Sequence, residues 1–384
     1  MKKSLWMLGM AVAALTSCTN DEVVEMNQSN AIQFESFVNK GTRAVSVTDN
    51  STLSSFYVFG YHTKDPNPVF ENIQVTKTET VENDKIIWET QDNDAKNWTA
   101  NTYYFGAYAG TGSSAAYPLT GANGATDPTV SFTNEGTLTI ANYTVSGTEN
   151  DLVAAVETVD NSTLANHAVN MEFKHLLSQV KFQFINNSNY FMTVSNITFK
   201  APAKGTCTIN QSGVINWNIE PTKTLDEDAN LESFQYTYPG TTSETYIEPD
   251  LKEYVSDAFL VLPQSILLNT DDLNSSDFVA DFVIEFYERL GTGTDDDPYV
   301  YNRTERIEYN NVSLLGTPKI VKDDSGDEIS NDGENVTAWT EGYIYNYKAY
   351  FPANPSEIKF TASVVDWQTE NVDDNLTEDK EIEF

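Results

Sequence analysis

The segment Phe278-Val-Ala-Asp-Phe-Val-Ile-Glu-Phe-Tyr287 decides the fold class, because its residues alternate in character. One alternating set is apolar (Phe278, Ala280, Phe282, Ile284 and Phe286), and the other contains Asp281 and Glu285. A period of two places the apolar set on one face of a β-strand, whereas a helix repeats every ~3.6 residues. The same alternation recurs in residues 180–184, 343–348 and 360–364. We therefore predict a chain built from strands.

Clusters of residues that favour turns separate these segments. Gly, Asn, Asp and Ser gather in residues 110–113, 121–124 and 323–326, and residues 291–298 read as a hairpin loop between two strands. Helical signal is sparse, and its best candidate is a short turn around His175-Leu-Leu177. Many short strands with frequent turns predict an all-β chain of β-sandwiches. A length of 384 residues allows about two domains, and we expect their boundary near Ala168.

The N-terminus has the layout of a secretory signal. Lys2 and Lys3 precede an apolar run from residue 5 to residue 15, and Leu15-Thr-Ser-Cys18 resembles a bacterial lipobox. We expect residues 1–17 to be removed and the Cys18 thiol to be lipidated; an ordinary signal peptide with an incidental cysteine is the alternative. No later stretch reaches the ~20 apolar residues of a membrane helix. The protein is therefore expected to be anchored to a membrane by lipid and not to span it.

Composition argues for an exposed location. The chain has 57 acidic and 22 basic residues, for a formal net charge of −35. This charge argues against nucleic acid and anionic lipid as partners. With Cys18 lipidated, Cys207 is the second and last cysteine, so no intramolecular disulfide is expected and stability must come from packed cores.

The residues that usually carry catalysis are few. The histidines are His62, His167 and His175, and no HExxH, CxxC, P-loop or GxSxG motif occurs. We interpret His175 as structural and Cys207 as a small buried strand residue. A secreted hydrolase would need acid and base groups that converge in a cleft, which the sequence does not indicate. We therefore predict that the protein is not an enzyme, with no catalytic residue and no cofactor.

Two acidic loops raise the question of calcium. Residues 323–328 and 295–297 offer carboxylate oxygens, but neither loop has EF-hand spacing. Acidic turns of this kind are usually solvated, so we predict no metal site.

Several segments together carry a resemblance to a known family. They include Phe56-Tyr-Val-Phe-Gly60, Trp98 with Tyr103-Tyr-Phe-Gly-Ala-Tyr108, Asp151-Leu-Val-Ala-Ala155, Phe173-Lys-His-Leu-Leu-Ser-Gln-Val-Lys-Phe182, Phe259-Leu-Val-Leu-Pro-Gln264, Trp339-Thr-Glu-Gly-Tyr-Ile-Tyr345 and Val364-Val-Asp-Trp367. In this order they resemble the fimbrillin family of Bacteroides and Porphyromonas relatives, the subunits of type V pili. The matching segments span nearly the whole chain.

The resemblance implies an architecture and a maturation step. Fimbrillins have two tandem transthyretin-like β-sandwich domains of Greek-key type and reach the outer membrane as lipoproteins. An arginine-specific, trypsin-like protease then removes the N-terminal segment. This removal exposes a groove, which a strand from another fimbrial subunit fills. Here the cut would follow Arg43 in Lys40-Gly-Thr-Arg43 and leave Ala44 first. Residues 18–43 would be the lipidated pro-segment, 44–168 the N-terminal domain and 169–384 the C-terminal domain.

The pro-segment contains a strand-like stretch at residues 31–38. Ile32 and Phe34 share one alternating face, so this stretch could occupy a strand position and cover a sheet edge before cleavage. Its removal would expose unpaired backbone groups and an apolar groove that captures another strand. The alternative is that residues 19–43 form only a flexible tether behind the lipid.

In the family the donor strand comes from the C-terminal segment. Here residues 369–384 are dominated by Asp and Glu, with only Val372, Leu376, Ile382 and Phe384 apolar. A donor strand should alternate over most of its length. This departure leaves the positions of stalk, anchor, tip or accessory subunit open.

An alternative function is a surface glycan-binding lipoprotein of a nutrient-uptake system. Its signature would be an exposed aromatic platform, for which Trp98, Trp217, Trp339 and Trp367 are candidates. Tryptophans in strands more often belong to a core. The order of the family-like segments and the Arg43 site favour the fimbrial subunit.

Overall fold

The computed structural model describes the chain as strands and their connections. It describes residues 31–366 apart from 39–52, 64, 83–84, 91–93, 111–127, 146–150, 164–167, 220–230, 237–245, 257, 266–277, 295, 315–318, 323–327, 331–334 and 353–359. No helix occurs among these residues, so none is long and apolar enough to cross a membrane. The all-β fold class and the β-sandwich layering are confirmed.

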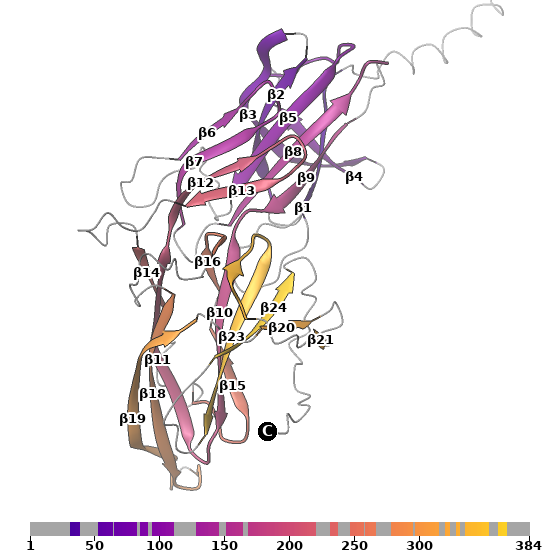
Figure 1. Cartoon of the computed structure of the whole chain (residues 1–384). Coiled ribbons are helices and arrows are strands. Elements are labelled where there is room, and N and C mark those ends of the chain that lie inside the picture. The colour runs from indigo at the N-terminus through magenta and orange to yellow at the C-terminus, as the bar shows by residue number, and fades with distance from the viewer. Residues whose placement is uncertain are drawn as a thin grey trace, which may run out of the picture.

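The N-terminal part is a closed sheet in the order β1-β4-β3-β2-β5-β8-β9. Its strands are β1 (Phe34–Val38), β2 (Ser55–His62), β3 (Asp65–Glu82), β4 (Lys85–Thr90), β5 (Thr102–Gly110), β8 (Leu152–Asp160) and β9 (Val169–His175). The inside is filled by an aromatic core that includes Phe34, Phe56, Phe70, Trp88, Trp98, Phe105 and Phe173. It occupies the upper half of the molecule in Figure 1.

A second sheet covers the closed sheet from outside, in the order β13-β12-β7-β6. Its strands are β6 (Thr129–Phe132), β7 (Leu138–Thr144), β12 (Lys204–Ile209) and β13 (Ile215–Ile219). Phe132 packs against Phe59 with ring centroids 6.4 Å apart. A Cβ atom at Gly106 would lie 2.5 Å from the Phe132 ring, so the two sheets approach closely because residue 106 has no side chain.

We expect Gly106→Ala to lower the free energy of unfolding by about 1–3 kcal/mol, because the added methyl group forces the Phe132 ring out of its site. Urea unfolding followed by tyrosine and tryptophan fluorescence measures this change. In a Phe132→Ala background the same substitution should cost little, because the clashing ring is absent. An equal cost in both backgrounds would contradict the proposed contact.

The C-terminal part is a sandwich of two sheets. One has the order β15-β10-β23-β24-β20-β21, with β16 also paired to β10, and the other has the order β14-β11-β18-β19. The strands of the first are β10 (Ser178–Asn187), β15 (Lys252–Val255), β16 (Phe259–Val261), β20 (Lys319–Lys322), β21 (Glu328–Ser330), β23 (Tyr343–Pro352) and β24 (Thr361–Asp366). The strands of the second are β11 (Phe191–Pro202), β14 (Leu231–Tyr236), β18 (Val279–Leu290) and β19 (Val300–Ser313); β17 (Gln264–Ser265) pairs with β22 (Ala338–Trp339).

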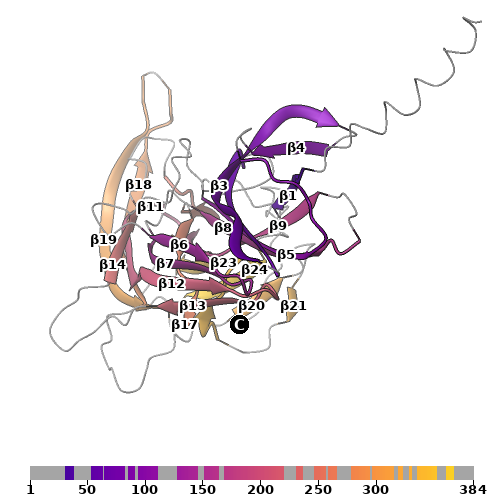
Figure 2. The same cartoon turned by 90° about the horizontal axis from the view of Figure 1, so that it is seen from above.

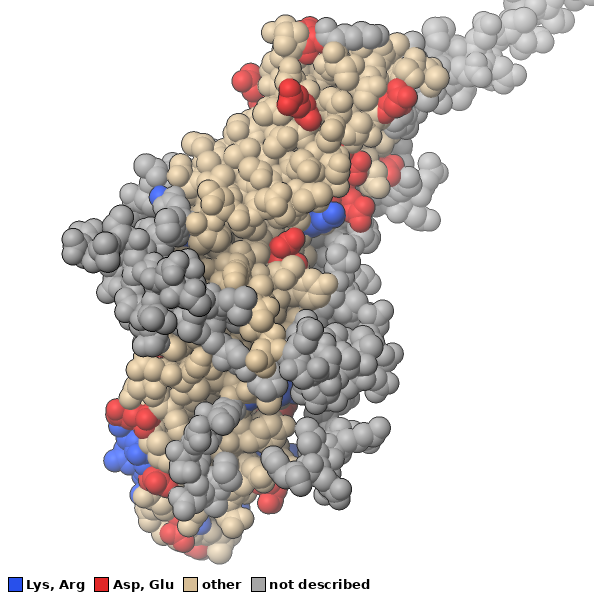
Figure 3. All heavy atoms as spheres, viewed as in Figure 1, with Lys and Arg blue, Asp and Glu red and all other residues tan. Residues whose placement is uncertain are grey.

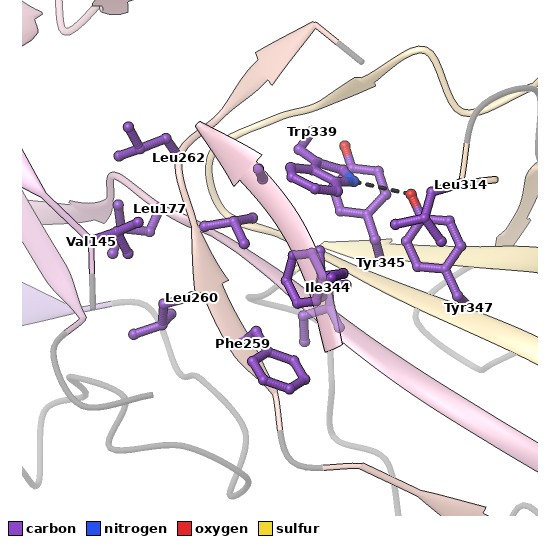
Figure 4. Close-up of a cluster of buried hydrophobic side chains, with 14 of the residues drawn as sticks. Val145, Leu177, Phe259, Leu260, Leu262, Leu314, Trp339, Ile344, Tyr345 and Tyr347 are labelled. Carbon is purple, nitrogen blue, oxygen red and sulfur yellow. Dashed lines mark hydrogen bonds between the residues drawn. The ribbon is translucent and has the colours of Figure 1, made fainter. Parts of the chain in front are cut away.

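The chain passes between the two parts three times, after β9, after β11 and after β13. Leu176 and Leu177 connect β9 to β10, and Ala203 connects β11 to β12; all three are buried. One hydrophobic cluster continues through this junction, where Trp339 Nε1 donates to Tyr347 Oη at 3.0 Å (Figure 4). The division near Ala168 stays a prediction, and the pairing adds that β9, β12 and β13 lie in the sheets of the N-terminal part.

The sequence patterns correspond closely to the strands. In β18 the residues Ala280, Phe282, Ile284 and Phe286 are buried, as predicted, and residues 291–298 connect β18 to β19 as a hairpin loop. The short helical turn expected around His175–Leu177 is wrong. His175 ends β9, and Leu176 donates its N–H to Leu152 O at 2.8 Å while the chain changes sheet.

Candidate functional site

The strand β1 occupies a position that closes the N-terminal sheet. It pairs in parallel with β9, from Phe34 opposite Val169 to Val38 opposite Phe173, and antiparallel with β4 where Phe34 faces Trp88. Figure 2, seen from above, shows β1 between β4 and β9. We call this position, with the core residues that β1 contacts, the β1 slot. The strand predicted in residues 31–38 is thereby confirmed, and it covers two strand edges.

Two side chains of this segment enter the core of the closed sheet. Ile32 and Phe34 are 5% and 2% exposed. The Phe34 ring makes edge contacts with Phe56, Phe70 and Phe105 at centroid distances of 6.0, 5.7 and 5.9 Å. Burial of two large apolar side chains contributes about 3–6 kcal/mol. Ile32 and Phe34 are therefore part of the core of the closed sheet.

Backbone hydrogen bonds fix the N-terminal end of the segment. Ile32 donates its N–H to Lys96 O at 2.7 Å, and Val169 donates to Gln33 O at 2.8 Å. Ala31 forms an antiparallel bridge with Asn97. Without residues 31–38 these groups on β9 and around Lys96 would lose their partners, and a strand edge without partners can accept another strand.

The remaining walls of the β1 slot are apolar. Trp88 and Trp98 are 3% and 2% exposed, and Val169, Met171 and Phe173 alternate inward along β9. Phe56 contacts both Trp88 and Phe173 at 5.2 Å between centroids. This alternation on β9 was visible in the sequence but gave no indication that β1 is its partner.

The predicted processing residues Cys18, Arg43 and Ala44 lie outside the described residues. In the sequence, Arg43 follows Val38, the last residue of β1, by five positions. A cut there would separate β1 covalently from every other described strand.

The structure brings together two of the family-like segments through a buried pair. His175 Nδ1 lies 2.9 Å from Asp151 Oδ2, with side chains 2% and 0% exposed. The pair joins the end of β9 to the residue that precedes β8, beside the backbone bond from Leu176 to Leu152. It occupies the core of the junction, and the interpretation of His175 as a structural residue agrees with this position.

Other candidates are also placed in cores. Cys207 is buried in β12, and burial raises the pKa of its thiol to about 12, which makes it a poor nucleophile. Trp98 and Trp339 are core residues, and Trp217 donates its indole N–H to Leu176 O at 2.9 Å. The described tryptophans therefore form no exposed platform. Trp367 lies outside the described residues.

The acidic loops give no metal centre in the part of the chain that the structure describes, where no group of three or more His, Cys, Asp or Glu is suitably clustered. Residues 323–327 and Asp295 lie outside that part. The absence of a calcium site in these loops therefore stays a prediction.

Comparison with known proteins gives a consistent result. The sequence model of a family described as fimbrillin-like matches residues 42–367. The fold is similar to that of a fimbrial protein from Bacteroides vulgatus ATCC 8482, with a TM-score of 0.50 and 14% identity over 87% of this chain and 99% of that chain. A protein from Bacteroides ovatus ATCC 8483, described in connection with cell adhesion, aligns with a TM-score of 0.42 and 16% identity over 88% of this chain and 97% of that chain. No curated protein matches the sequence.

Proposed function

The chain belongs to the fimbrillin-like family, and from this premise we propose that it is a structural subunit of a cell-surface fimbria that assembles by protease-triggered donor-strand exchange. The observation that carries the proposal is the β1 slot. A strand from the pro-segment completes the closed sheet, and the predicted cut follows five positions after that strand. Cleavage would convert an intramolecular strand into a separate peptide that another subunit's strand can replace.

The pairing of β1 offers a physical reason for exchange in one direction. β1 runs parallel to β9, and parallel ladders are slightly less stable per residue than antiparallel ones. A replacing strand that runs the opposite way would pair antiparallel with β9 along the five residues of that ladder, and would run parallel to β4, where β1 has one registered pair. Its apolar side chains would fill the positions of Ile32 and Phe34.

The choice of Arg43 as the processing site has support from the positions of the other arginines. The sequence has four, and Arg289, Arg303 and Arg306 lie in the paired strands β18 and β19. Backbone held in a sheet ladder resists proteolysis. An arginine-specific protease would therefore act at Arg43 and leave the folded sheets intact.

The remaining parts of the proposal concern location and domain type. Residues 1–17 are the signal peptide, Cys18 carries the lipid that anchors the precursor to the outer membrane, and the cut form is part of the fimbria. The two parts of the fold are tandem transthyretin-like sandwiches of Greek-key type. Other fimbrial subunits are the partners, and residues 369–384 are the candidate donor segment, which leaves the position within the fimbria open. Glycan uptake through a tryptophan platform has no support from the described tryptophans.

Cleavage of the precursor that begins at residue 19 tests the proposal. With an arginine-specific protease we expect Ala44 as the new N-terminus and a ladder of non-covalent multimers that resist detergent. Arg43→Gln removes the cation that the protease recognises, so this variant should keep its full length and remain monomeric. N-terminal sequencing and sizing measure both results.

Lys40→Gln is the matched control, because it removes a nearby positive charge without removing the arginine. It should be cut and should assemble like the unchanged chain. A cut at Ala44 that yields only monomers would contradict strand exchange, and resistance of the unchanged precursor to the protease would contradict the processing step.

A further inference from the structure

The β18–β19 hairpin carries aromatic rings and cations on the outer face of its sheet, at the end of the molecule away from the closed sheet (Figure 1). We call this cluster the hairpin patch; its members are Phe191, Tyr246, Tyr287, Arg289, Tyr299 and Tyr301. Tyr287 lies between Phe191 on β11 and Arg303 on β19, and Arg289 lies opposite Tyr301. Residues directly opposite in a sheet share a face. This face is the outer one, because Ile284 and Phe286 on the other face are buried in the core.

The rings of the hairpin patch form a continuous aromatic surface. Tyr246 stacks on Tyr301 with centroids 3.9 Å apart and planes inclined by 9°. The edge of Tyr287 contacts Tyr246 at 5.0 Å, and Phe191 contacts Tyr301 at 5.3 Å. Tyr246 and Tyr301 are only partly buried, and Tyr299 is 46% exposed. The exposed parts of Tyr299 and Tyr301 are therefore the surface on which the ring of a ligand can pack.

Arg289 is held between two of these rings. Its guanidinium carbon lies 4.6 Å from the Phe191 centroid and 4.5 Å from the Tyr299 centroid. Tyr299 can pack there because Gly293 has no side chain: a Cβ atom at residue 293 would lie 2.4 Å from the Tyr299 ring. Stacking uses the faces of the guanidinium plane and leaves the N–H donors at its rim. The rings thus orient a planar donor group at the surface.

The ion pairs of this hairpin involve arginines other than Arg289. Glu285 accepts from Arg303 Nη1 at 2.7 Å and from the Tyr287 hydroxyl at 2.7 Å, and Arg306 pairs with both Glu285 and Glu308. Burial opposes ionisation of Glu285, but the bonds from Tyr287 and Arg303 hold its pKa below the ordinary value. In the described part of the chain no carboxylate pairs with Arg289.

The distribution of arginine strengthens this observation. Three of the four arginines of the chain lie on this hairpin, although the protein has a formal net charge of −35. Figure 3 shows Lys and Arg gathered at the lower left, where Figure 1 places β19, with Asp and Glu directly around them. A local excess of arginine among aromatic rings is typical of recognition surfaces.

We propose that the hairpin patch binds a carbohydrate that carries a carboxylate group, such as a uronic acid or a sialic acid residue. The C–H face of a sugar ring packs on the exposed tyrosine rings. The carboxylate accepts paired hydrogen bonds from Arg289, whose fork matches carboxylate geometry. The site extends the proposed function, but it does not depend on strand exchange because it lies away from the β1 slot.

The chemistry favours this ligand over other anions. Nucleic acid and densely sulfated chains carry closely spaced charges that the strongly acidic protein repels. An acidic peptide offers carboxylates but no broad ring face for the tyrosines. A sugar with one carboxylate per ring combines a stacking face with an isolated anionic group.

Calorimetric titration of the uncut precursor from residue 19 tests the site. The probes are trigalacturonate and sialyllactose, each compared with its own methyl ester. We expect at least one acidic sugar to bind and its uncharged counterpart to bind at least about tenfold more weakly, the loss expected for a charge-assisted hydrogen bond. The two pairs distinguish uronic acid from sialic acid.

Variants assign the binding to the hairpin patch. Arg289→Gln should weaken binding of the acidic sugar by about tenfold or more. Tyr301→Ala should weaken binding of the acidic and neutral sugars alike. Lys252→Gln removes an exposed cation from β15 in the same sandwich and should change nothing. Failure of both acidic sugars to bind, equal binding of the methyl ester, or tighter binding of a short polyglutamate peptide would overturn the assignment.

Discussion

Replacement of Phe34 by alanine is expected to destabilise the uncut precursor and to leave the cut protein unchanged. In the precursor the Phe34 ring is 2% exposed and contacts three phenylalanines, so its loss should lower the free energy of unfolding by about 3–5 kcal/mol. After a cut at Arg43, residue 34 belongs to the released segment. Denaturant unfolding before and after cleavage measures both effects.

Phe173→Ala provides the matched control, because Phe173 lines the same core but remains with the subunit after the cut. It should destabilise both forms. Strand release should also be faster in the Phe34→Ala precursor, so multimers should form sooner after cleavage. If Phe34→Ala destabilises the cut form as much as Phe173→Ala does, the pro-segment has not left and exchange is contradicted.

Asp151→Ala is expected to cost about 1–3 kcal/mol in the free energy of unfolding, because it removes one partner of a buried hydrogen bond. The His175 imidazole would lose the carboxylate 2.9 Å from its Nδ1 atom, at the point where β9 continues into β10. The change should appear equally before and after cleavage, because both residues remain in the subunit. Thermal and denaturant unfolding check the prediction.

The double variant Asp151→Ala/His175→Ala separates pairing from packing. Substitutions of residues in direct contact do not have additive effects on the free energy of unfolding. The double variant should therefore lose less stability than the sum of the losses of the two single variants. Additive costs would show that the two side chains stabilise the junction independently, in contradiction of the pair.

Local patterns in the sequence were sufficient to predict several strands. Alternation identified β18, β10 and the strand in residues 31–38, where Ile32 and Phe34 enter the core. The partners of that strand could not be predicted, because Trp88 and Val169 are distant in sequence and a strand pattern does not specify its neighbours. The turn expected at His175–Leu177 failed for a similar reason. Its two leucines are buried by the junction between sheets, which no local pattern records.

The hairpin patch was missed although part of its signal was present. Three arginines within β18 and β19 stand out in a chain with four. Their meaning depends on Tyr246, which reaches the hairpin from a separate segment, and on the register that aligns Phe191 with Tyr287. Candidate binding platforms were sought among tryptophans, and the described tryptophans are mainly core residues.

Strand exchange depends on release of β1, and a reversible tether tests that step most directly. Ala31 and Asn97 are bridge partners, and the bond from Ile32 N–H to Lys96 O identifies them as a non-hydrogen-bonded antiparallel pair. Such pairs bring Cα atoms to ~4.5 Å, within the range that a disulfide spans. The raised pKa of buried Cys207 keeps that thiol out of exchange. The variant Ala31→Cys/Asn97→Cys can therefore be locked and released.

The decisive measurement is the size distribution of this variant after cleavage at Arg43, with and without reductant. The account predicts that the oxidised protein remains monomeric although its backbone is cut, and that reduction restores the multimers of the unchanged chain. The single-cysteine variants should form multimers under both conditions. Equal multimer formation by the oxidised and reduced forms would contradict the claim that departure of β1 opens the site of assembly.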